Sequence, residues 1–202
     1  MIVTKKKSFE EVLELINEYN KIILIGCGDC ATLCKTGGEE EVLELKKQLE
    51  DKGKSVVYTS VIDTACDQRL VKLEIKKFPK EYDCILSLSC GSGAQAISSL
   101  IGKPIFPATD TLYAGVTKRI GDFKKMCLLC GRCIIGEYAG ICPITMCSKS
   151  LLNGPCGGSD NGKCETDPDK DCAWQLIFDR LKEQKKLHIL DSYKEPKEWN
   201  IK

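Results

Sequence analysis

Residues 127–172 have the sequence CLLCGRCIIGEYAGICPITMCSKSLLNGPCGGSDNGKCETDPDKDC. Eight of these 46 residues are cysteine and seven are glycine, and the apolar residues keep no helical or strand period for long. We expect such a segment to bury too little carbon to offset its chain entropy by packing alone. Disulfides or bound metal must therefore hold it together.

The cysteine inventory of the whole chain favours metal. There are 14 cysteines and a single histidine, His188, which we expect in a surface or tail position. The N-terminus, MIVTKKKSFEEV, has basic residues without the apolar run of a secretory signal, so we expect a cytoplasmic protein with reduced thiols. A thiolate-only set favours iron–sulfur clusters or an all-cysteine zinc site, and it disfavours Cys–His nucleophilic catalysis.

Length and charge exclude several classes of function. At 202 residues, the chain has room for one good-sized domain, or for one domain plus a small stapled module. A net charge of +1 lacks the excess of positive charge that is typical of nucleic-acid-binding proteins. No apolar run approaches the roughly 20 residues of a membrane helix, so no membrane span is expected.

The first part of the chain alternates between apolar runs and helical patterns, which predicts βαβ units and a parallel sheet. The spacing of Ser8 and Glu11 indicates a capping box at the start of a first helix. We predict a small open α/β domain over residues 1–116 and a cysteine-rich, metal-stapled module, ferredoxin-like or irregular, over residues 117–202. The predicted strands lie at 21–26, 55–62, 82–89 and 103–108.

Five cysteines follow the predicted strands. Because the loops after parallel strands emerge at one edge of the sheet, these cysteines should converge, and four of them suffice for one cluster. A thioredoxin-like dithiol at Cys27-x2-Cys30 would leave Cys34, Cys66 and Cys90 without a role. The flanking glycines permit tight turns whose amides could face an anion. Cys84, inside the third strand, is expected to be a buried structural thiol. The five candidates are Cys27, Cys30, Cys34, Cys66 and Cys90.

The triplet Cys127-x2-Cys130-x2-Cys133 has the spacing of a ferredoxin-type cluster. Five cysteines come after it, so one completes the cluster of the triplet and four form a third site, either iron–sulfur or zinc. The spacing alone does not assign them. After residue 172 a helix with an apolar face of Trp174, Ile177, Phe178 and Leu181 is predicted. The five late cysteines are Cys142, Cys147, Cys156, Cys164 and Cys172.

Long motifs give a family resemblance. The run ICPITMCSKSLLNGPCGGSDNGKCE, preceded by CLLCGRC, resembles the C-terminal-type domain of methylenetetrahydrofolate reductases. The stretches GCGDCATLCKTGGEEEV and VIDTACDQRLV are similar to the N-terminal half of the same group. Together they resemble the small accessory subunit of acetogen-type two-subunit reductases, whose large subunit is a TIM barrel that carries flavin and the folate site. This chain lacks the length and eightfold repeat of a barrel, so it should bind neither flavin nor folate alone.

The resemblance implies an electron-transfer subunit that relays electrons between an external donor, such as ferredoxin or another redox subunit, and the flavin of the catalytic partner. Its cofactors would be two or more [4Fe–4S] clusters, with zinc as an option at one site. The first alternative is a zinc-stapled structural subunit of the same complex without a redox role. The second alternative is an enzyme with an open iron at the N-terminal cluster, for which the strand ends offer few acid–base groups beyond Asp29, Asp63 and Asp67.

Overall fold

The computed structural model describes residues 1–119 and 121–197 and divides the chain into two compact units, residues 1–124 and 125–202. We call them unit 1 and unit 2. The division falls later than residue 116, where the sequence places it, because the connecting segment is a hairpin rather than a loop. Its strands are β6 (Thr109–Arg119) and β7 (Asp122–Cys127).

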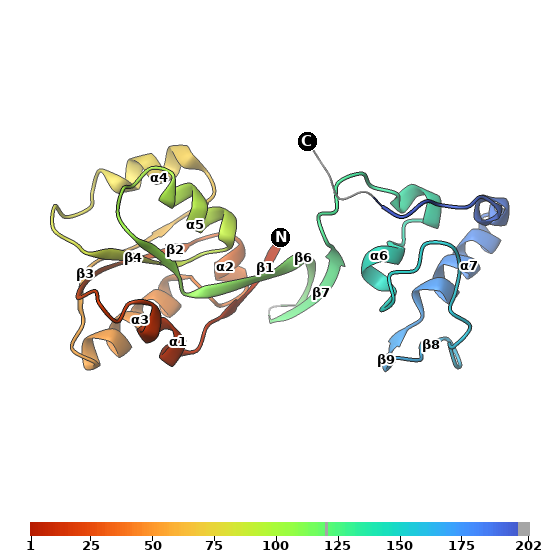
Figure 1. Cartoon of the computed structure of the whole chain (residues 1–202), viewed down its shortest axis with the longest axis horizontal. Coiled ribbons are helices and arrows are strands. Elements are labelled where there is room, and N and C mark those ends of the chain that lie inside the picture. Colours follow the sequence, from red (N-terminus) through yellow and green to blue (C-terminus); the bar gives the residue numbers. More distant parts are fainter. Residues whose placement is uncertain (120, 198–202) are drawn as a thin grey trace. The chain divides into compact units, whose positions relative to one another are not determined.

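Unit 1 contains a four-stranded parallel sheet in the order β3-β2-β4-β5 (Figure 1). The central strand β2 is buried along nearly its whole length, as the run KIILIG predicts. It pairs with a neighbour on each side, for example Ile23 with Tyr58 and with Ile85. The four predicted strands are confirmed as β2 (Lys21–Cys27), β3 (Ser55–Ile62), β4 (Cys84–Leu88) and β5 (Ile105–Pro107).

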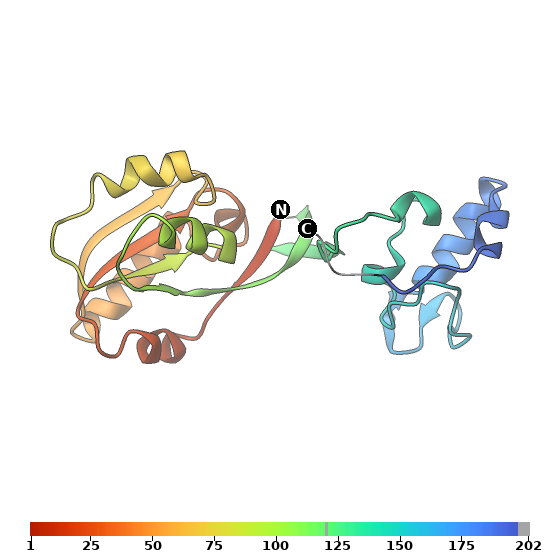
Figure 2. The ribbon, with the colours of Figure 1, turned by 45° about the horizontal axis from the view of Figure 1, so that its top comes forward.

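Helices cover both faces of this sheet (Figures 1 and 2). Alternation along β2 sends Ile22 and Leu24 to one face and Ile23 and Ile25 to the other. The first face packs against α1 (Phe9–Leu15) and α3 (Glu39–Asp51), and the second against α4 (Gln68–Ile75) and α5 (Gly91–Ser98). The two apolar layers fix the register of the strands and hence the positions of the loops that follow them.

Local signals set the helix ends. The Ser8 hydroxyl accepts a hydrogen bond from the Glu11 amide at 3.2 Å, which confirms the Ser8 half of the predicted capping box, while the Glu11 carboxylate pairs with Lys7 instead. Gly53, at φ +79°, ends α3 in the left-handed conformation that favours glycine. The C-terminal end of α1 has no such residue, and a lysine distant in sequence binds the carbonyls of the segment that follows it. The Lys54 ammonium donates to the carbonyls of Ile16, Asn17 and Tyr19 at 3.2, 2.9 and 2.8 Å.

Replacing Lys54 with methionine should lower the free energy of unfolding of unit 1 by about 1–3 kcal/mol, because charge-assisted hydrogen bonds to the three carbonyls are lost. Urea unfolding followed by circular dichroism measures this change. The matched control is Lys52→Met, because Lys52 is exposed and its change should stay within about 0.5 kcal/mol. Equal losses in the two variants would contradict the anchoring role of Lys54.

A second, antiparallel sheet was not predicted from the sequence. β1 (Ile2–Lys6) pairs with β6, and β6 pairs with β7, in the order β1-β6-β7. The register places Val3 opposite Tyr113, more than a hundred residues away. Sequence patterns do not reveal the strands of this sheet. Among their described residues only Val3, Thr4, Thr109 and Gly115 are buried, so none of the three strands alternates cleanly between buried apolar and exposed polar residues.

Unit 2 has a hydrophobic core with two aromatic side chains, although the sequence predicts little packing in the cysteine-rich stretch. Tyr138 and Ile141, from the cysteine-rich stretch, pack with Trp174, Ile177 and Leu181 of α7 (Ala173–Glu183). The rings of Tyr138 and Trp174 meet edge to face at 5.8 Å. The remaining elements are short: η1 (Ile135–Tyr138), α6 (Pro143–Met146), β8 (Lys163–Cys164), β9 (Asp167–Asp171) and η2 (Leu187–Asp191).

The prediction that Phe178 belongs to that core is wrong. Phe178 was expected on the buried face of the last helix, yet it is 43% exposed. It follows Ile177 by a single residue, so the 100° step of the helix turns it away from the core. In the part of the chain that the structure describes, no helix is both long and apolar enough to cross a membrane.

Candidate metal-binding cysteines

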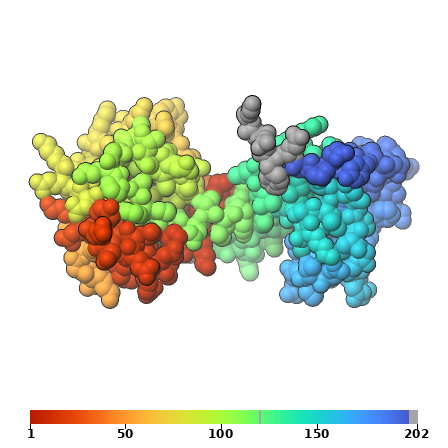
Figure 3. All heavy atoms as spheres, viewed as in Figure 1, coloured from red at the N-terminus to blue at the C-terminus, as the bar shows by residue number. Residues whose placement is uncertain are grey.

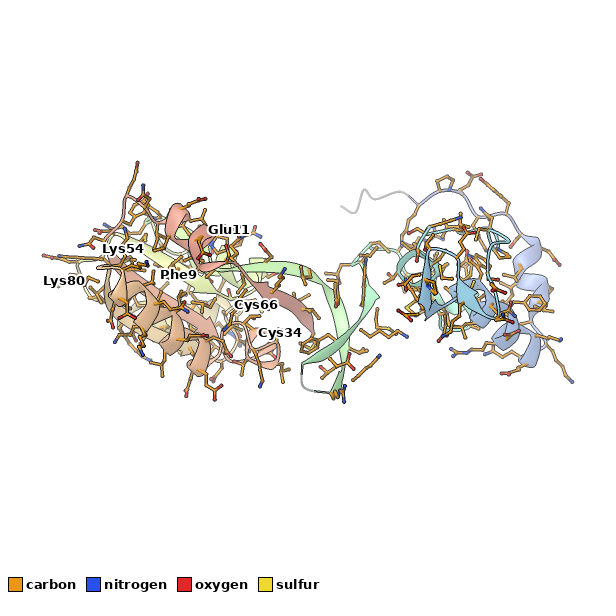
Figure 4. All side chains as sticks on the ribbon, turned by 90° about the horizontal axis from the view of Figure 1, so that it is seen from below. Phe9, Glu11, Cys34, Lys54, Cys66 and Lys80 are labelled. Atoms are coloured by element: carbon orange, nitrogen blue, oxygen red, sulfur yellow. The ribbon has the colours of Figure 1, made fainter. Side chains whose placement is uncertain are left out.

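The loop cysteines of unit 1 gather at the carboxyl edge of the parallel sheet. Cys27 is the last residue of β2, Cys66 lies in the turn after β3, and Cys90 caps the start of α5 directly after β4. Cys30 and Cys34 begin and cap the short helix α2 (Cys30–Leu33). Figure 4 shows Cys34 and Cys66 at the same end of the unit, away from Lys54 and Lys80.

The electrostatics of the thiols show which of them are close. Burial raises the pKa of the Cys66 thiol, and the negative charges of Cys90, Cys27 and Cys30 raise it further. Burial likewise raises the pKa of Cys30, and Cys90 again contributes to the increase. The structure therefore brings Cys66 within electrostatic reach of Cys27, Cys30 and Cys90, and Cys30 within reach of Cys90. A positive ion among them would reverse this mutual repulsion.

Strand β1 supplies a residue that sequence reasoning missed. The Ile2 amide donates to the Cys30 sulfur at 3.4 Å, and the Cys34 thiol donates to the Ile2 carbonyl at 3.8 Å. Ile2 thus fixes both cysteines of α2 through its backbone. No side-chain pattern could reveal this, because any residue carries the same amide and carbonyl.

The glycines near these cysteines have a different role from the one predicted. We expected their amides to face an anion, but the Gly28 amide donates to the Ile62 carbonyl and the Gly91 amide to the Thr111 hydroxyl, both at 2.8 Å. Glycine in this region instead allows neighbouring backbone segments to lie close together. A Cβ atom at Gly37 would lie 1.7 Å from the Leu88 carbonyl oxygen, and the Gly37 carbonyl in turn accepts the Cys27 amide at 2.9 Å.

Replacing Gly37 with alanine should therefore lower the free energy of unfolding by about 3 kcal/mol or more, because the backbone of β4 cannot move away from the added methyl. Thermal unfolding of the full chain measures the effect. Gly102→Ala is the control, since nothing lies within 4 Å of a Cβ atom there. A Gly37→Ala protein as stable as that control would show that the α2 loop does not require this contact.

In unit 2 the triplet follows β7 directly. Cys127 ends that strand, and the next turns place Leu129 at φ +54° and Gly131 at φ +82°. The left-handed Leu129 carries an exposed side chain, and its amide donates to the Cys127 sulfur at 3.3 Å. A strained, unpacked leucine whose amide faces a thiol fits a binding loop for an anionic thiolate centre. The spacing predicted the triplet but not this strain.

Four of the five late cysteines surround one small cavity. They come from separate elements: the end of α6, the following loop, β8 and the residue before α7. The cavity has a volume of about 20 Å³, room for one water-sized body. Cys142 is not among its lining residues; it caps the start of α6, and its thiol donates to the Thr145 hydroxyl at 3.6 Å. The cysteines that line the cavity are Cys147, Cys156, Cys164 and Cys172.

Charged and polar groups at this cavity favour thiolates. Side-chain hydrogen bonds with Thr166 and Ser148 lower the pKa of Cys164 to about 7, and the Cys164 thiol donates to the Ser148 hydroxyl at 3.6 Å. The ion pair with Glu165 raises the pKa of Lys149, and the charges of Cys156 and Cys147 raise it further, so the ammonium lies near both sulfurs. Sequence patterns gave no sign of Lys149 or Glu165, because each is one of many charged residues in an irregular stretch.

Over residues 1–119 and 121–197, no group of three or more Cys, His, Asp or Glu side chains is arranged to hold a metal ion. The cysteine side chains would have to turn toward a common point to bind one. All 14 are free thiols. His188, predicted to be a surface residue, is exposed in η2.

A family model described as "Methylene-tetrahydrofolate reductase C terminal" matches residues 106–200. These residues are similar to that C-terminal region. The match spans just under half of the chain and includes the triplet and all five late cysteines, which confirms the resemblance read from that stretch. Residues 1–105 lie outside it. The comparison with curated proteins found no match, and neither did the comparison with solved structures.

Proposed function

We propose that this chain is an electron-transfer subunit associated with a methylenetetrahydrofolate reductase, with iron–sulfur centres at the loop cysteines of unit 1 and at the triplet of unit 2. The observation that carries the proposal is the gathering of cysteines from three separate loops at one edge of the parallel sheet. Burial for packing alone does not account for this, because Cys66 is exposed. The reductase association rests on the family match over residues 106–200.

The ligand sets follow from the positions of the cysteines. In unit 1, Cys27, Cys30, Cys66 and Cys90 would hold the first centre, and the contacts of Ile2 would orient α2 toward it. Cys34 forms its polar contact with the Ile2 carbonyl and is left as the fifth thiol. Bound iron–sulfur clusters supply one-electron transfers, which suits a flavin partner that accepts electrons singly.

In unit 2 the cavity separates the late cysteines into two groups. A space for one water-sized body between four cysteines suits a single zinc ion with sulfurs at about 2.3 Å. We therefore assign Cys147, Cys156, Cys164 and Cys172 to zinc. Cys142 then completes the triplet of Cys127, Cys130 and Cys133 by elimination.

Anaerobic purification followed by iron, acid-labile sulfide and zinc analysis tests the proposal. We expect iron and sulfide in equal amounts, about one zinc per chain, and a brown protein with visible charge-transfer absorption. Reduced protein mixed with the flavin subunit of the reductase should reduce that flavin within a turnover. A colourless protein with zinc and no sulfide would refute the electron-transfer role.

That last outcome would instead support a zinc-stapled structural subunit, which is the second candidate. The cavity of unit 2 favours it specifically, because four cysteines around a space for one ion are the ligand set of a structural zinc site. The zinc-only candidate does not explain why Cys27, Cys30, Cys66 and Cys90 lie near one another in unit 1. Metal analysis of the purified chain therefore decides between the candidates.

A further inference from the structure

The C-terminal segment of unit 2 brings a lysine to the cysteine triplet. The Lys197 ammonium donates a hydrogen bond to the Cys130 sulfur at 2.8 Å and a second one to the Arg132 carbonyl. Lys197 is separated from Cys130 by 67 residues, so the contact depends on the path of the chain after α7. Among the described residues, this is the one lysine for which the structure records a hydrogen bond to a cysteine sulfur.

The segment before Lys197 is fastened at two points. The Asn153 side-chain amide donates to the Lys194 carbonyl at 2.8 Å, and the Lys194 amide donates back to the Asn153 amide oxygen at 2.7 Å. The Lys194 ammonium also pairs with Glu137 at 2.5 Å. Pro196, next to Lys197, has a fixed φ angle and stiffens the last step.

These contacts define a strap, residues 192–197, which runs over unit 2 after η2. In Figures 1 and 3 the dark blue C-terminal residues lie against the green and teal residues of the same unit. Asn153 is in the turn that precedes the cavity cysteine Cys156, so the strap starts near the late cysteines and ends at the triplet.

We propose that Lys197 sets the reduction potential of the centre held by the triplet, and that the Asn153 clamp positions it; this inference rests on the proposed function. One-electron reduction makes a thiolate-ligated centre more negative. A cation that donates to a ligand sulfur therefore stabilises the reduced form more than the oxidised form and raises the potential. Lys197 is a positioning residue that acts through the Cys130 sulfur.

The test is a redox titration of the full chain, followed by electron paramagnetic resonance. The signal that disappears in Cys130→Ala identifies the centre of the triplet. In Lys197→Gln the ratio of reduced to oxidised centre at a fixed potential should fall about tenfold, which corresponds to a midpoint lower by about 59 mV. Lys197→Arg should stay close to the wild type, because it keeps the charge. Asn153→Ala should move in the same direction as Lys197→Gln, since it releases the strap.

Lys182→Gln is the matched control, because it removes a positive charge from an exposed position on α7. Its midpoint should equal that of the wild type. A Lys197→Gln protein with full iron content and an unchanged midpoint would overturn the inference and leave the proposed function intact. A wild-type protein with no centre at the triplet would overturn the proposed function itself, and the inference with it.

Discussion

Alanine in place of Cys156 should abolish zinc binding and unfold the β8–β9 part of unit 2. The loop from residue 152 to residue 172 has only a two-stranded ladder and few buried apolar side chains, so its order would depend on the metal. Structural zinc contributes about 10–16 kcal/mol of binding energy that becomes folding energy. Limited proteolysis should cut this loop in the variant and spare it in the wild type.

The control for this experiment is Cys142→Ala. Cys142 is outside the cavity, so this variant should keep its zinc and its resistance to proteolysis while it loses iron from the triplet. Metal analysis by mass spectrometry separates the two variants. Loss of zinc in both, or in neither, would contradict the division of the late cysteines into a tetrad and a single ligand.

If the proposed iron–sulfur centre of unit 1 exists, alanine in place of Cys66 should remove it and spare both proposed sites of unit 2. Cys66 is exposed and caps no helix, so its replacement costs little packing and acts mainly through the lost ligand. Iron content should fall by about half if each unit holds one [4Fe–4S] cluster. Cys90→Ala should give the same loss, since both thiols act on one another electrostatically.

The matched control is Cys84→Ala. Cys84 is fully buried in β4, and burial raises the pKa of its thiol to about 12, so it stays protonated and packs as a small apolar side chain. Its loss should lower stability slightly and leave the iron content unchanged. An iron content that does not change in Cys66→Ala would refute a shared centre at the sheet edge.

The sequence predicts the parallel sheet well because each of its strands carries a physical signature. β2 and β4 are continuous apolar runs with helices between them, and buried strands of parallel sheets have this composition. The placement of Cys27, Cys66 and Cys90 after successive strands follows from the same topology, since parallel strands end at one edge. These predictions require no knowledge of contacts between distant residues.

Other features depend on long-range contacts and leave no local pattern. β1 is recognisable only through its pairing with β6, which joins residues more than a hundred positions apart. The contact of Lys197 with Cys130 and the clamp at Asn153 are set by the course of the chain after α7. The sequence shows that glycines near the cysteines of unit 1 permit tight turns, and this favours amides that face an anion. It does not show where the amide groups point.

The pairing of β1 with β6 also has a consequence for biosynthesis. Ile2 is translated before its partner strand, which ends at Arg119, so the two strands can meet only after more than a hundred further residues have been translated. Until then Cys30 and Cys34 lack the backbone contacts that hold them. Since non-local strand pairing forms late in folding, insertion of the proposed metal centre of unit 1 is expected to follow the synthesis of the hairpin rather than accompany that of α2.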